Sequence, residues 1–308
     1  MIDTRQGTRK KTSPMQRGKT RTFYIIMAPF LLMFLAYRLF PMVWGVYISF
    51  TNYSGFNMNN LKLVGWSNYV RAFTDSQAFS SLGRTFLIGV ITIPLSMIIC
   101  NFMAIILSMK VKNVGVYRTL FYIPSIIPAV AVGTIWNGMF LRDGGVINEI
   151  IKTFGGEPVN WLGYERIFIS LIVMMLWTAG ASVLNNIASI KNISQDLFEA
   201  ARLDGAGNWK IITKIILPMM APMNYMALTT GVISSLQLFG QPLMLSGGGM
   251  STVPIEPVYT YMVHAYQQIF ANLRFGYGLA LTWIVFLIMV VFTIVNKRIE
   301  KKWVHNDE

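Results

Sequence analysis

The sequence predicts an all-α, polytopic membrane protein with six transmembrane helices. Of its 308 residues, 54% are hydrophobic and only 13% are charged, whereas about a quarter of the residues in a soluble domain carry a charge. The mean hydropathy is +0.51. The apolar residues gather into runs that reach or exceed the roughly 20 residues an α-helix needs to cross a bilayer. The net charge of +13 is segregated between these runs, which excludes a typical nucleic-acid-binding protein.

The amino-terminal residues 1–22 are expected to form a disordered basic tail at the membrane surface, because Arg and Lys recur there among Gly, Ser and Thr. A signal peptide is the alternative interpretation of a basic stretch before an apolar run. We reject it because no small-residue cleavage site follows and the apolar run is too long. The first predicted span is Phe23–Phe50. Arg38 within it is expected to snorkel or to face the protein interior, because charge is costly in hydrocarbon.

Five further spans are expected, separated by polar or glycine-rich segments. Residues 51–84 are rich in Asn, Tyr and Trp, and these aromatic residues are typical of a membrane interface; residues 141–166 are expected to form a loop. The middle spans contain Ser, Thr, Asn, Gln and Gly, as expected of helices that pack on one another or line a water-filled path. The five spans are Thr85–Met109, Leu120–Phe140, Ile167–Ile190, Met219–Leu245 and Tyr277–Val295. The transmembrane domain is thus placed at residues 23–298, before a short tail at residues 299–308.

The distribution of Lys and Arg predicts the orientation of the chain. These residues crowd both terminal tails, the link between the second and third spans, and the link between the fourth and fifth. In the opposite loops they are spread thinly over longer stretches. The positive-inside rule therefore places both termini and the link after the fourth span in the cytoplasm. An even number of spans agrees with this placement.

The link after the fourth span, residues 191–218, carries the most specific pattern and is named the EAA segment after Glu199-Ala200-Ala201. Ser194 or Asn192 can cap a short helix here by accepting a backbone N–H. Acidic residues in its first turns suit the helix dipole. Glycines are expected to end this helix, and a second amphipathic stretch then runs up to Pro218.

One face of the predicted EAA helix has almost no side chains. Ala201 and Gly205 are four residues apart, so both are expected on the same face. Such a face lets the surface of another protein approach closely. We therefore predict that the EAA segment is a docking surface, although a helix–turn–helix that only joins two spans would look similar.

The residues support neither catalysis nor metal binding. The sequence contains no Walker loop, no G-x-S-x-G and no H-E-x-x-H. Cys100 is the only cysteine, and is expected to face lipid or the core; His264 and His305 show no ligand spacing. Asp and Glu are almost absent from the apolar runs, which argues against a carrier that relies on buried carboxylates. The energy for any transport is therefore expected to come from a partner protein.

The EAA segment resembles a known motif. Glu199-Ala200-Ala201, three residues, Gly205, nine residues and then Ile-x-Leu217-Pro218 is similar to the EAA loop of the membrane subunits of bacterial ABC importers. The fuller stretch is similar to their carbohydrate-uptake branch, of the maltose and glycerol-phosphate permease type. The resemblance covers nearly the whole chain from Phe23. It includes Tyr117–Pro124, Trp136, Gly145–Asn148, Trp161–Leu162, Trp177 and Gly276–Gly278. The chain departs from the family at Leu245–Met250, where a glycine-rich turn lacks the usual proline, so a looser loop is expected there.

This resemblance implies the type I permease fold of ABC importers, in a multi-pass protein of the bacterial cytoplasmic membrane. It also implies a second homologous permease, two cytoplasmic ATPases and an extracytoplasmic solute-binding protein as partners. ATP and Mg²⁺ would bind to the ATPases, and this chain would hold no cofactor and catalyse nothing. Closure of the ATPases would move the EAA segment and turn the path from inward to outward. The residues assigned to coupling are Glu199, Ala200, Ala201, Asp204, Gly205, Leu217 and Pro218.

Candidate residues for the substrate path follow from the chemistry of sugars. A sugar presents hydroxyl groups and flat apolar ring faces, so its site needs hydroxyl or amide partners beside an aromatic ring. The family places its path between the fourth, fifth and sixth spans. Suitable residues there are Trp177, Ser182, Asn185, Ser234, Ser235, Gln237 and Gln241. The alternative is that these polar groups only bridge neighbouring helices and that Trp177 packs.

Two other functions are considered. The first is an ABC permease for another polar solute, such as a glycerol phosphodiester or a polyamine; a polyamine path should carry carboxylates, which these spans lack. The second is a channel or secondary carrier that works alone, which would show solute flux without ATPase partners. A membrane-embedded enzyme lacks any constellation of acids, bases or metal ligands.

Overall fold

The computed structural model describes residues 14–56, 58–59, 61–109, 113–246 and 253–303. These residues form helices and connecting turns, with a single isolated antiparallel bridge between Thr51 and Leu63. The α-helices are α1 (Pro14–Phe34), α2 (Phe40–Ser49), α3 (Ser67–Thr74), α4 (Ser76–Ser108), α5 (Val114–Ile126), α6 (Ala129–Met139), α7 (Val146–Thr153), α8 (Ile167–Trp177), α9 (Gly180–Lys191), α10 (Gln195–Leu203), α11 (Asn208–Ile211), α12 (Leu217–Met219), α13 (Ala221–Leu236), α14 (Gly240–Leu245), α15 (Tyr261–Phe270) and α16 (Phe275–Trp303). The predicted all-α class is confirmed.

The described residues contain up to six helical spans. Three are continuous helices that are long and apolar enough to cross a membrane, namely Thr22–Ser49, Ser76–Ser108 and Phe275–Ile299. Three more are pairs of helices that meet at a bend of 101°, 42° and 59°. These pairs are α5 with α6, α8 with α9, and Asn208–Met219 with α13. Six spans result if each bent pair counts as one, in agreement with the prediction.

The sharpest bend, in the third span, has a cause in the sequence. Ile127 is extended, with φ −70° and ψ 129°, as is favoured for a residue that precedes proline. Pro128 then stands directly before α6, so the α5 helix cannot continue across it. The predicted span Leu120–Phe140 is therefore two helices nearly at right angles.

The predicted fifth span, Met219–Leu245, is wrong at its end. Helix α13 ends at Leu236, and Gly240–Leu245 forms the separate helix α14. Helix α14 packs closely on α6, where a Cβ added to Gly133 would overlap the side chain of Met244. Hydropathy along the chain could not separate the two helices, since both are apolar.

Other predicted boundaries also shift. Helix α1 begins at Pro14, within the residues predicted as a disordered tail, and α16 continues to Trp303, past the predicted domain boundary. Helix α4 begins at Ser76 because Asp75 caps it, accepting hydrogen bonds from the N–H groups of Gln77 and Ala78. The predicted loop at residues 141–166 contains α7. Residues 1–13 and the glycine-rich turn at 247–252 lie outside the described residues.

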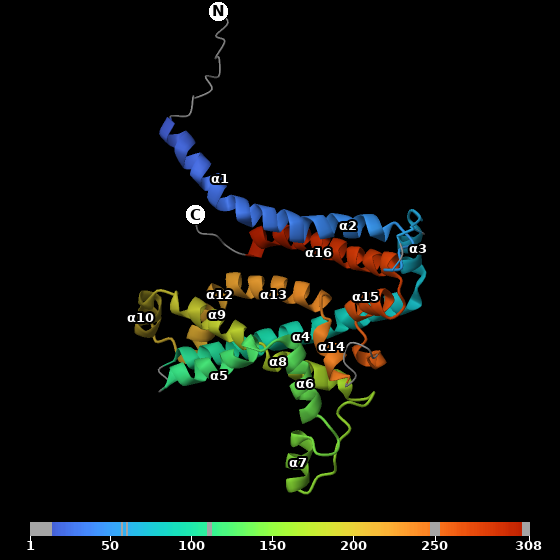
Figure 1. The fold of residues 1–308 in the computed structure, drawn as a ribbon. Helices are drawn as coiled ribbons and strands as arrows, with labels where there is room; N and C mark the ends of the chain where they lie inside the picture. The colour runs from blue at the N-terminus through green and yellow to red at the C-terminus, as the bar shows by residue number, and fades with distance from the viewer. Residues whose placement is uncertain (1–13, 57, 60, 110–112, 247–252, 304–308) are drawn as a thin grey trace, which may run out of the picture.

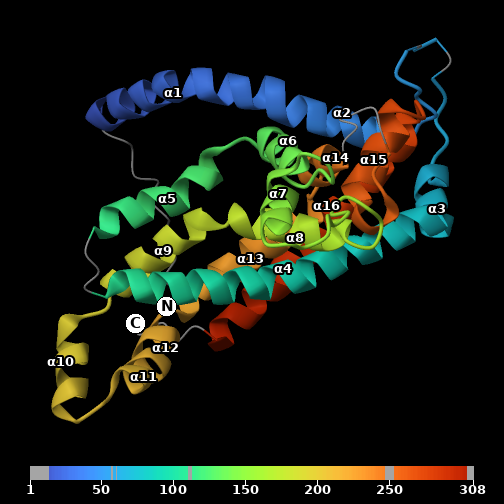
Figure 2. The ribbon, with the colours of Figure 1, turned by 90° about the horizontal axis from the view of Figure 1, so that it is seen from below.

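The first span lies at the edge of the molecule. Helix α2 runs along α16, whereas α1 continues beyond the bundle (Figures 1 and 2). A π-helical turn, Leu35–Leu39, joins the two and contains Arg38. Arg38 is exposed, so it does not face the interior of this chain.

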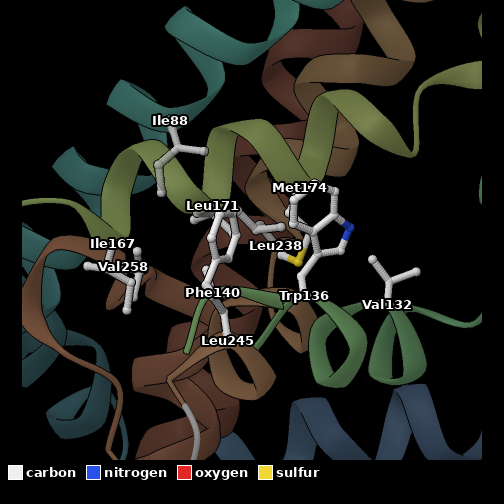
Figure 3. Close-up of a cluster of buried hydrophobic side chains, with 10 residues drawn as sticks. All are labelled: Ile88, Val132, Trp136, Phe140, Ile167, Leu171, Met174, Leu238, Leu245 and Val258. Carbon is white, nitrogen blue, oxygen red and sulfur yellow. The ribbon is translucent and has the colours of Figure 1, made fainter. Parts of the chain in front are cut away.

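Four buried clusters hold the described helices together, and two of them lie close to the residues singled out in the sequence. One is centred on Trp136 of α6 and on Phe140 directly after this helix, which point toward Leu171 and Met174 of α8 (Figure 3). The other joins α4, α9 and the start of α13, and includes Cys100, which is 2% exposed and therefore faces the core. This second cluster also includes Ile211 and Ile216 of the EAA segment, so it fixes that segment to the bundle.

Candidate functional site

The EAA segment protrudes at one end of the molecule. It contains α10, α11 and α12, and α10 lies at the edge of the structure in both views (Figures 1 and 2). Ser194 is the N-cap of α10, and its Oγ accepts a hydrogen bond from Asp196 N–H at 3.3 Å. Of the two predicted caps, Ser194 is therefore the one used. Asp196 in the first turn and Arg202 in the last suit the helix dipole.

Gly205 ends the EAA helix through backbone geometry. Its φ of +76° is a left-handed conformation that glycine adopts without steric cost. Gly205 N–H donates to Arg202 O at 3.0 Å, and Ala206 N–H donates to Ala201 O at 2.9 Å. This pair of bonds is a Schellman motif, which satisfies carbonyls at the end of a helix. The predicted termination at Gly205 is confirmed.

The prediction that one face of the EAA helix has almost no side chains is wrong. Gly205 lies beyond the end of α10, so it does not share a helix face with Ala201. Ala201 is half-buried and packs inward with Phe198 against the cluster that contains Ile211. A spacing of four residues places two side chains on one face only within a continuous helix, and α10 ends at Leu203.

The outer face of the EAA segment carries large apolar side chains instead. Leu203 is 90% exposed and Trp209 is 77% exposed. Among the residues assigned to coupling, the exposed ones are Glu199, Ala200, Asp204, Gly205, Leu217 and Pro218. Exposed leucine and tryptophan at the tip of a protruding segment are typical of a surface that another protein covers.

A chain of three amides lies beneath the EAA segment. Asn186 Nδ2 of α9 donates to Asn101 Oδ1 of α4 at 2.8 Å, and Asn101 Nδ2 donates to Asn224 Oδ1 of α13 at 3.0 Å. We call these residues the asparagine chain. It connects α4 to the helix that enters the EAA segment and to the helix that leaves it. The sequence does not predict the asparagine chain, although three Asn residues in otherwise apolar spans are a signal for it.

The residues predicted to line the path do not form one group. Trp177 is 38% exposed and packs edge-on against Trp136 at a centroid distance of 5.7 Å. Ser235 is buried, and its Oγ donates to Thr85 O at 3.4 Å, so it bridges α13 and α4. It also borders an apolar cavity of about 320 Å³. Asn185, Ser234 and Gln237 are exposed, whereas Ser182 and Gln241 are half-buried.

Ser235 also fixes the spacing of two helices. A Cβ added to Gly89 of α4 would overlap Ser235 Oγ, so the two helices approach as closely as a glycine allows. Gln237 Nε2 contacts Met289 Sδ at 3.4 Å, which points it toward α16. Ser235 and Gln237 thus bridge neighbouring helices, which is the alternative to a role in the substrate path.

A polar network occupies the opposite end of the bundle, near α15. Tyr277 Oη donates to Asp75 Oδ2 at 2.6 Å, and Tyr259 Oη lies 3.0 Å from His264 Nδ1. His264 Nε2 is 3.3 Å from the same Asp75 oxygen, with too poor an alignment for a hydrogen bond. We call these four residues the α15 network. Close by, Arg84 forms an ion pair with Glu256.

Within the α15 network, the pKa values of His264 and Asp75 are both lowered. Burial lowers the pKa of His264 below its ordinary value and outweighs the opposing effect of Asp75. Burial raises the pKa of Asp75, but the hydrogen bonds from Tyr277 and from two backbone N–H groups, with the nearby His264, outweigh it and leave this pKa lowered. The folded state therefore favours a neutral histidine beside an ionised aspartate.

Up to six helical spans with an EAA segment protruding at one end are the architecture expected of an integral-membrane permease subunit. Residues 101–305 match the family described as the binding-protein-dependent transport system inner membrane component. The chain is 32% identical to a probable ABC transporter permease protein, YesP, of Bacillus subtilis (strain 168), over 92% of this chain and 91% of the relative. The chain belongs to this family of ABC importer permeases, which are multi-pass proteins of the inner membrane.

Further likenesses bear on the type of permease. The chain is 28% identical to the trehalose/maltose transport system permease protein MalF of Thermococcus litoralis, over 94% of this chain and 96% of that protein. The fold matches a chain of a bacterial alginate ABC transporter in complex with an alginate pentasaccharide-bound periplasmic protein, with a TM-score of 0.78 and 19% identity over 92% and 96% of the two chains. The predicted type I permease fold and the resemblance to carbohydrate-uptake permeases are confirmed.

Proposed function

We propose that this chain is one permease subunit of an ATP-driven importer for a carbohydrate, an oligosaccharide or a related sugar. It pairs with a second, homologous permease and receives its substrate from an extracytoplasmic solute-binding protein. Two cytoplasmic ATPase subunits, which bind ATP and Mg²⁺, drive it through the EAA segment. Both termini and the EAA segment face the cytoplasm, as the distribution of Lys and Arg predicts.

The observation that carries this proposal is the exposed apolar tip of the EAA segment. Leu203 and Trp209 face outward, while Phe198 and Ala201 fix α10 to the core beneath. A tip that is rigidly seated can pass on a force applied to it, and the asparagine chain extends that connection to α4, α9 and α13. A movement of the EAA segment on closure of the ATPases would in this way be transmitted to three spans at once.

A cysteine-labelling experiment tests both the orientation and the docking. The single native cysteine, Cys100, is buried, so a cysteine introduced at an exposed position provides the one accessible thiol among the described residues. Leu203→Cys should resist a membrane-impermeant maleimide in intact cells, react in inverted vesicles, and cross-link to the ATPase subunit in the assembled transporter. Phe154→Cys, at a residue that is 88% exposed beyond α7, is the matched control and should show the opposite sidedness. Labelling of Leu203→Cys in intact cells would falsify the proposal.

The substrate class is supported by the relatives and by the absence of buried carboxylates in the spans. Relatives named for trehalose/maltose, lactose and starch degradation products cover most of this chain. Uptake of labelled oligosaccharides by cells that lack this gene should fall, and a plasmid copy should restore it. Unchanged sugar uptake with reduced uptake of a glycerol phosphodiester or a polyamine would assign the importer to another polar solute.

Among the predicted path residues, we propose that Trp177 has the most direct role. It presents part of an aromatic ring at the surface, as a sugar ring requires, whereas Ser235 is already engaged with α4. Trp177→Ala should lower the uptake rate and alter preference among sugars, and Trp177→Phe should restore part of it. Ser235→Ala should act mainly on stability, by about 1 kcal/mol or less. Unchanged uptake rate and preference in Trp177→Ala would remove this assignment.

A further inference from the structure

A groove with cationic residues lies between α5 and α9, next to the EAA segment. Its volume is about 360 Å³. Helix α5 contributes Arg118, Thr119 and Tyr122, and α9 contributes Leu184, Ile187 and Lys191. Lys191 is the last residue of α9, so one wall of the groove continues directly into the EAA segment. Neither the coupling role nor the predicted path uses this groove.

Arg118 in the groove lacks a partner of its own. Its Nε atom is buried and has no hydrogen-bond acceptor within the described part of the chain. The ion pairs among the described residues are Arg84 with Glu256 and Lys152 with Glu149, and His264 lies close to Asp75. Neither Arg118 nor Lys191 has a carboxylate at such a distance. A buried, unpaired donor on a cation is unfavourable. Arg118 and Lys191 both line the groove, so an anion there would meet two cationic side chains that have no carboxylate partner.

The residues that line the groove indicate which kind of anion it would bind. A guanidinium fork pairs in a bidentate manner with phosphate, and a nearby ammonium adds a second positive charge. Thr119 Oγ1 already donates to Gly115 O at 3.1 Å, so its hydroxyl adds no donor to the groove. The wall formed by Leu184 and Ile187 is apolar and suits a hydrocarbon chain better than a free ion.

The position of the groove selects the source of the phosphate. It lies where two membrane-spanning helices reach the polar EAA segment, which is the depth of a lipid headgroup. Basic pockets between transmembrane helices at a membrane surface are typical sites for anionic lipids. We propose that Arg118 and Lys191 bind the phosphate of an anionic phospholipid, whose acyl chain lies along Leu184 and Ile187. The bound lipid connects α5 to α9 at the base of the EAA segment.

Photo-crosslinking on the assembled transporter tests this proposal. The complex with its partner subunits is reconstituted in nanodiscs that contain a photoactivatable phosphatidylglycerol or, separately, a photoactivatable phosphatidylcholine. Phosphatidylglycerol should label peptides that contain residues 118–122 and 184–191, and phosphatidylcholine should label them much less. The double variant Arg118→Gln with Lys191→Gln should lose about tenfold or more of this labelling, as expected when hydrogen bonds to a charged group are removed.

A matched control separates the groove from general surface charge. Arg202→Gln with Lys214→Gln removes the same charge from exposed positions on the EAA segment, outside the groove, and should keep the labelling. Arg118→Lys keeps the charge without the guanidinium fork and should give an intermediate signal. An excess of inorganic phosphate should not displace the lipid; full displacement would assign the site to free phosphate.

Three results would overturn the lipid site. They are equal labelling of the unmodified chain and the Arg118/Lys191 variant, equal labelling by the two lipids, and an absence of label because the partner permease covers the groove. Assembly with the ATPases, checked by co-purification, shows whether each variant is folded. The lipid site rests on the proposed permease function only in that the chain lies in a membrane. If the groove is labelled in a chain whose EAA segment does not bind the ATPase, the lipid site stands and the docking function fails.

Discussion

At the end of the bundle near α15, charged side chains are paired with one another, whereas no ion pair lies within the described residues of the EAA segment. Asp75 is engaged by Tyr277 and His264 as well as by two backbone N–H groups, and Arg84 is paired with Glu256. At the other end, Leu203 and Trp209 are exposed and Arg118 Nε has no acceptor. The first end is stabilised by its own contacts. The second presents groups that other molecules would satisfy.

Helix α4 spans the distance between these two ends. Asp75 caps its first turn, and Asn101 near its other end holds α9 and α13 through the asparagine chain. One rigid helix is therefore fixed by charge at one end and by amides at the other. The stability of the α15 end should therefore depend on pH and on its internal hydrogen bonds, whereas the function of the EAA end should depend on binding of its partners.

The largest effect is expected when the exposed tip of the EAA segment becomes charged. Leu203→Asp should weaken co-purification of the ATPase subunit by at least about 2 kcal/mol, roughly 30-fold, because a buried contact of an interface is replaced by an unpaired charge. Folding of this chain should be unaffected, since Leu203 is 90% exposed. Phe154→Asp is the control. Equal loss of the ATPase in both variants would contradict the assignment of the tip.

The asparagine chain should matter next. Asn101→Leu leaves Asn186 Nδ2 and Asn224 Oδ1 unpaired, so the thermal stability of the purified complex should fall by about 1–2 kcal/mol. The ratio of sugar uptake to ATP hydrolysis should fall as well, because α4 is no longer tied to the helices on both sides of the EAA segment. Asn185→Leu, next to the chain but exposed, is the matched control for stability. A loss of stability with an unchanged ratio of uptake to hydrolysis would show that the asparagine chain has only a structural role.

Two substitutions at Gly205 distinguish backbone conformation from close approach. Gly205→Ala should destabilise the end of α10 by roughly 1–2 kcal/mol, because alanine is strained at a φ of +76°. There is free space for the Cβ in this chain. Gly205→Asn, which tolerates the left-handed conformation, should lose less stability. If both variants lose ATPase binding equally while only alanine strains the helix, a partner approaches this residue closely.

The smallest effect is expected from pH at the α15 end. The pKa of His264 is lowered by burial, so the unfolded chain binds a proton more readily than the folded one. The stability that the neutral histidine contributes is therefore present above the unfolded-state pKa of about 6.5. It is lost as the pH falls below that value and through the lowered pKa of the folded state. His264→Gln should flatten this dependence in thermal unfolding between about pH 8 and 5. The asparagine chain does not titrate, so Asn101→Leu should leave the dependence unchanged.

The sequence predicted elements whose signals are local. Long apolar runs predicted the spans, and Ser194 and Gly205 correctly marked the beginning and end of the EAA helix. Pro128 lies within the predicted third span, but the 101° bend depends on the extended residue before it and on where α6 packs. The boundary between α13 and α14 was missed because both helices are apolar, and hydropathy has no feature at that point.

By itself, the sequence determined the membrane class, the number of spans, the family and the position of the EAA segment, because each depends on composition or on spacing along the chain. The tertiary structure decided which way the side chains point. It turned Ala201 inward and Leu203 outward, joined Asn101, Asn186 and Asn224 across three helices, and placed Arg118 and Lys191 along one groove. These juxtapositions depend on helix packing between residues distant in the sequence, which no local pattern encodes.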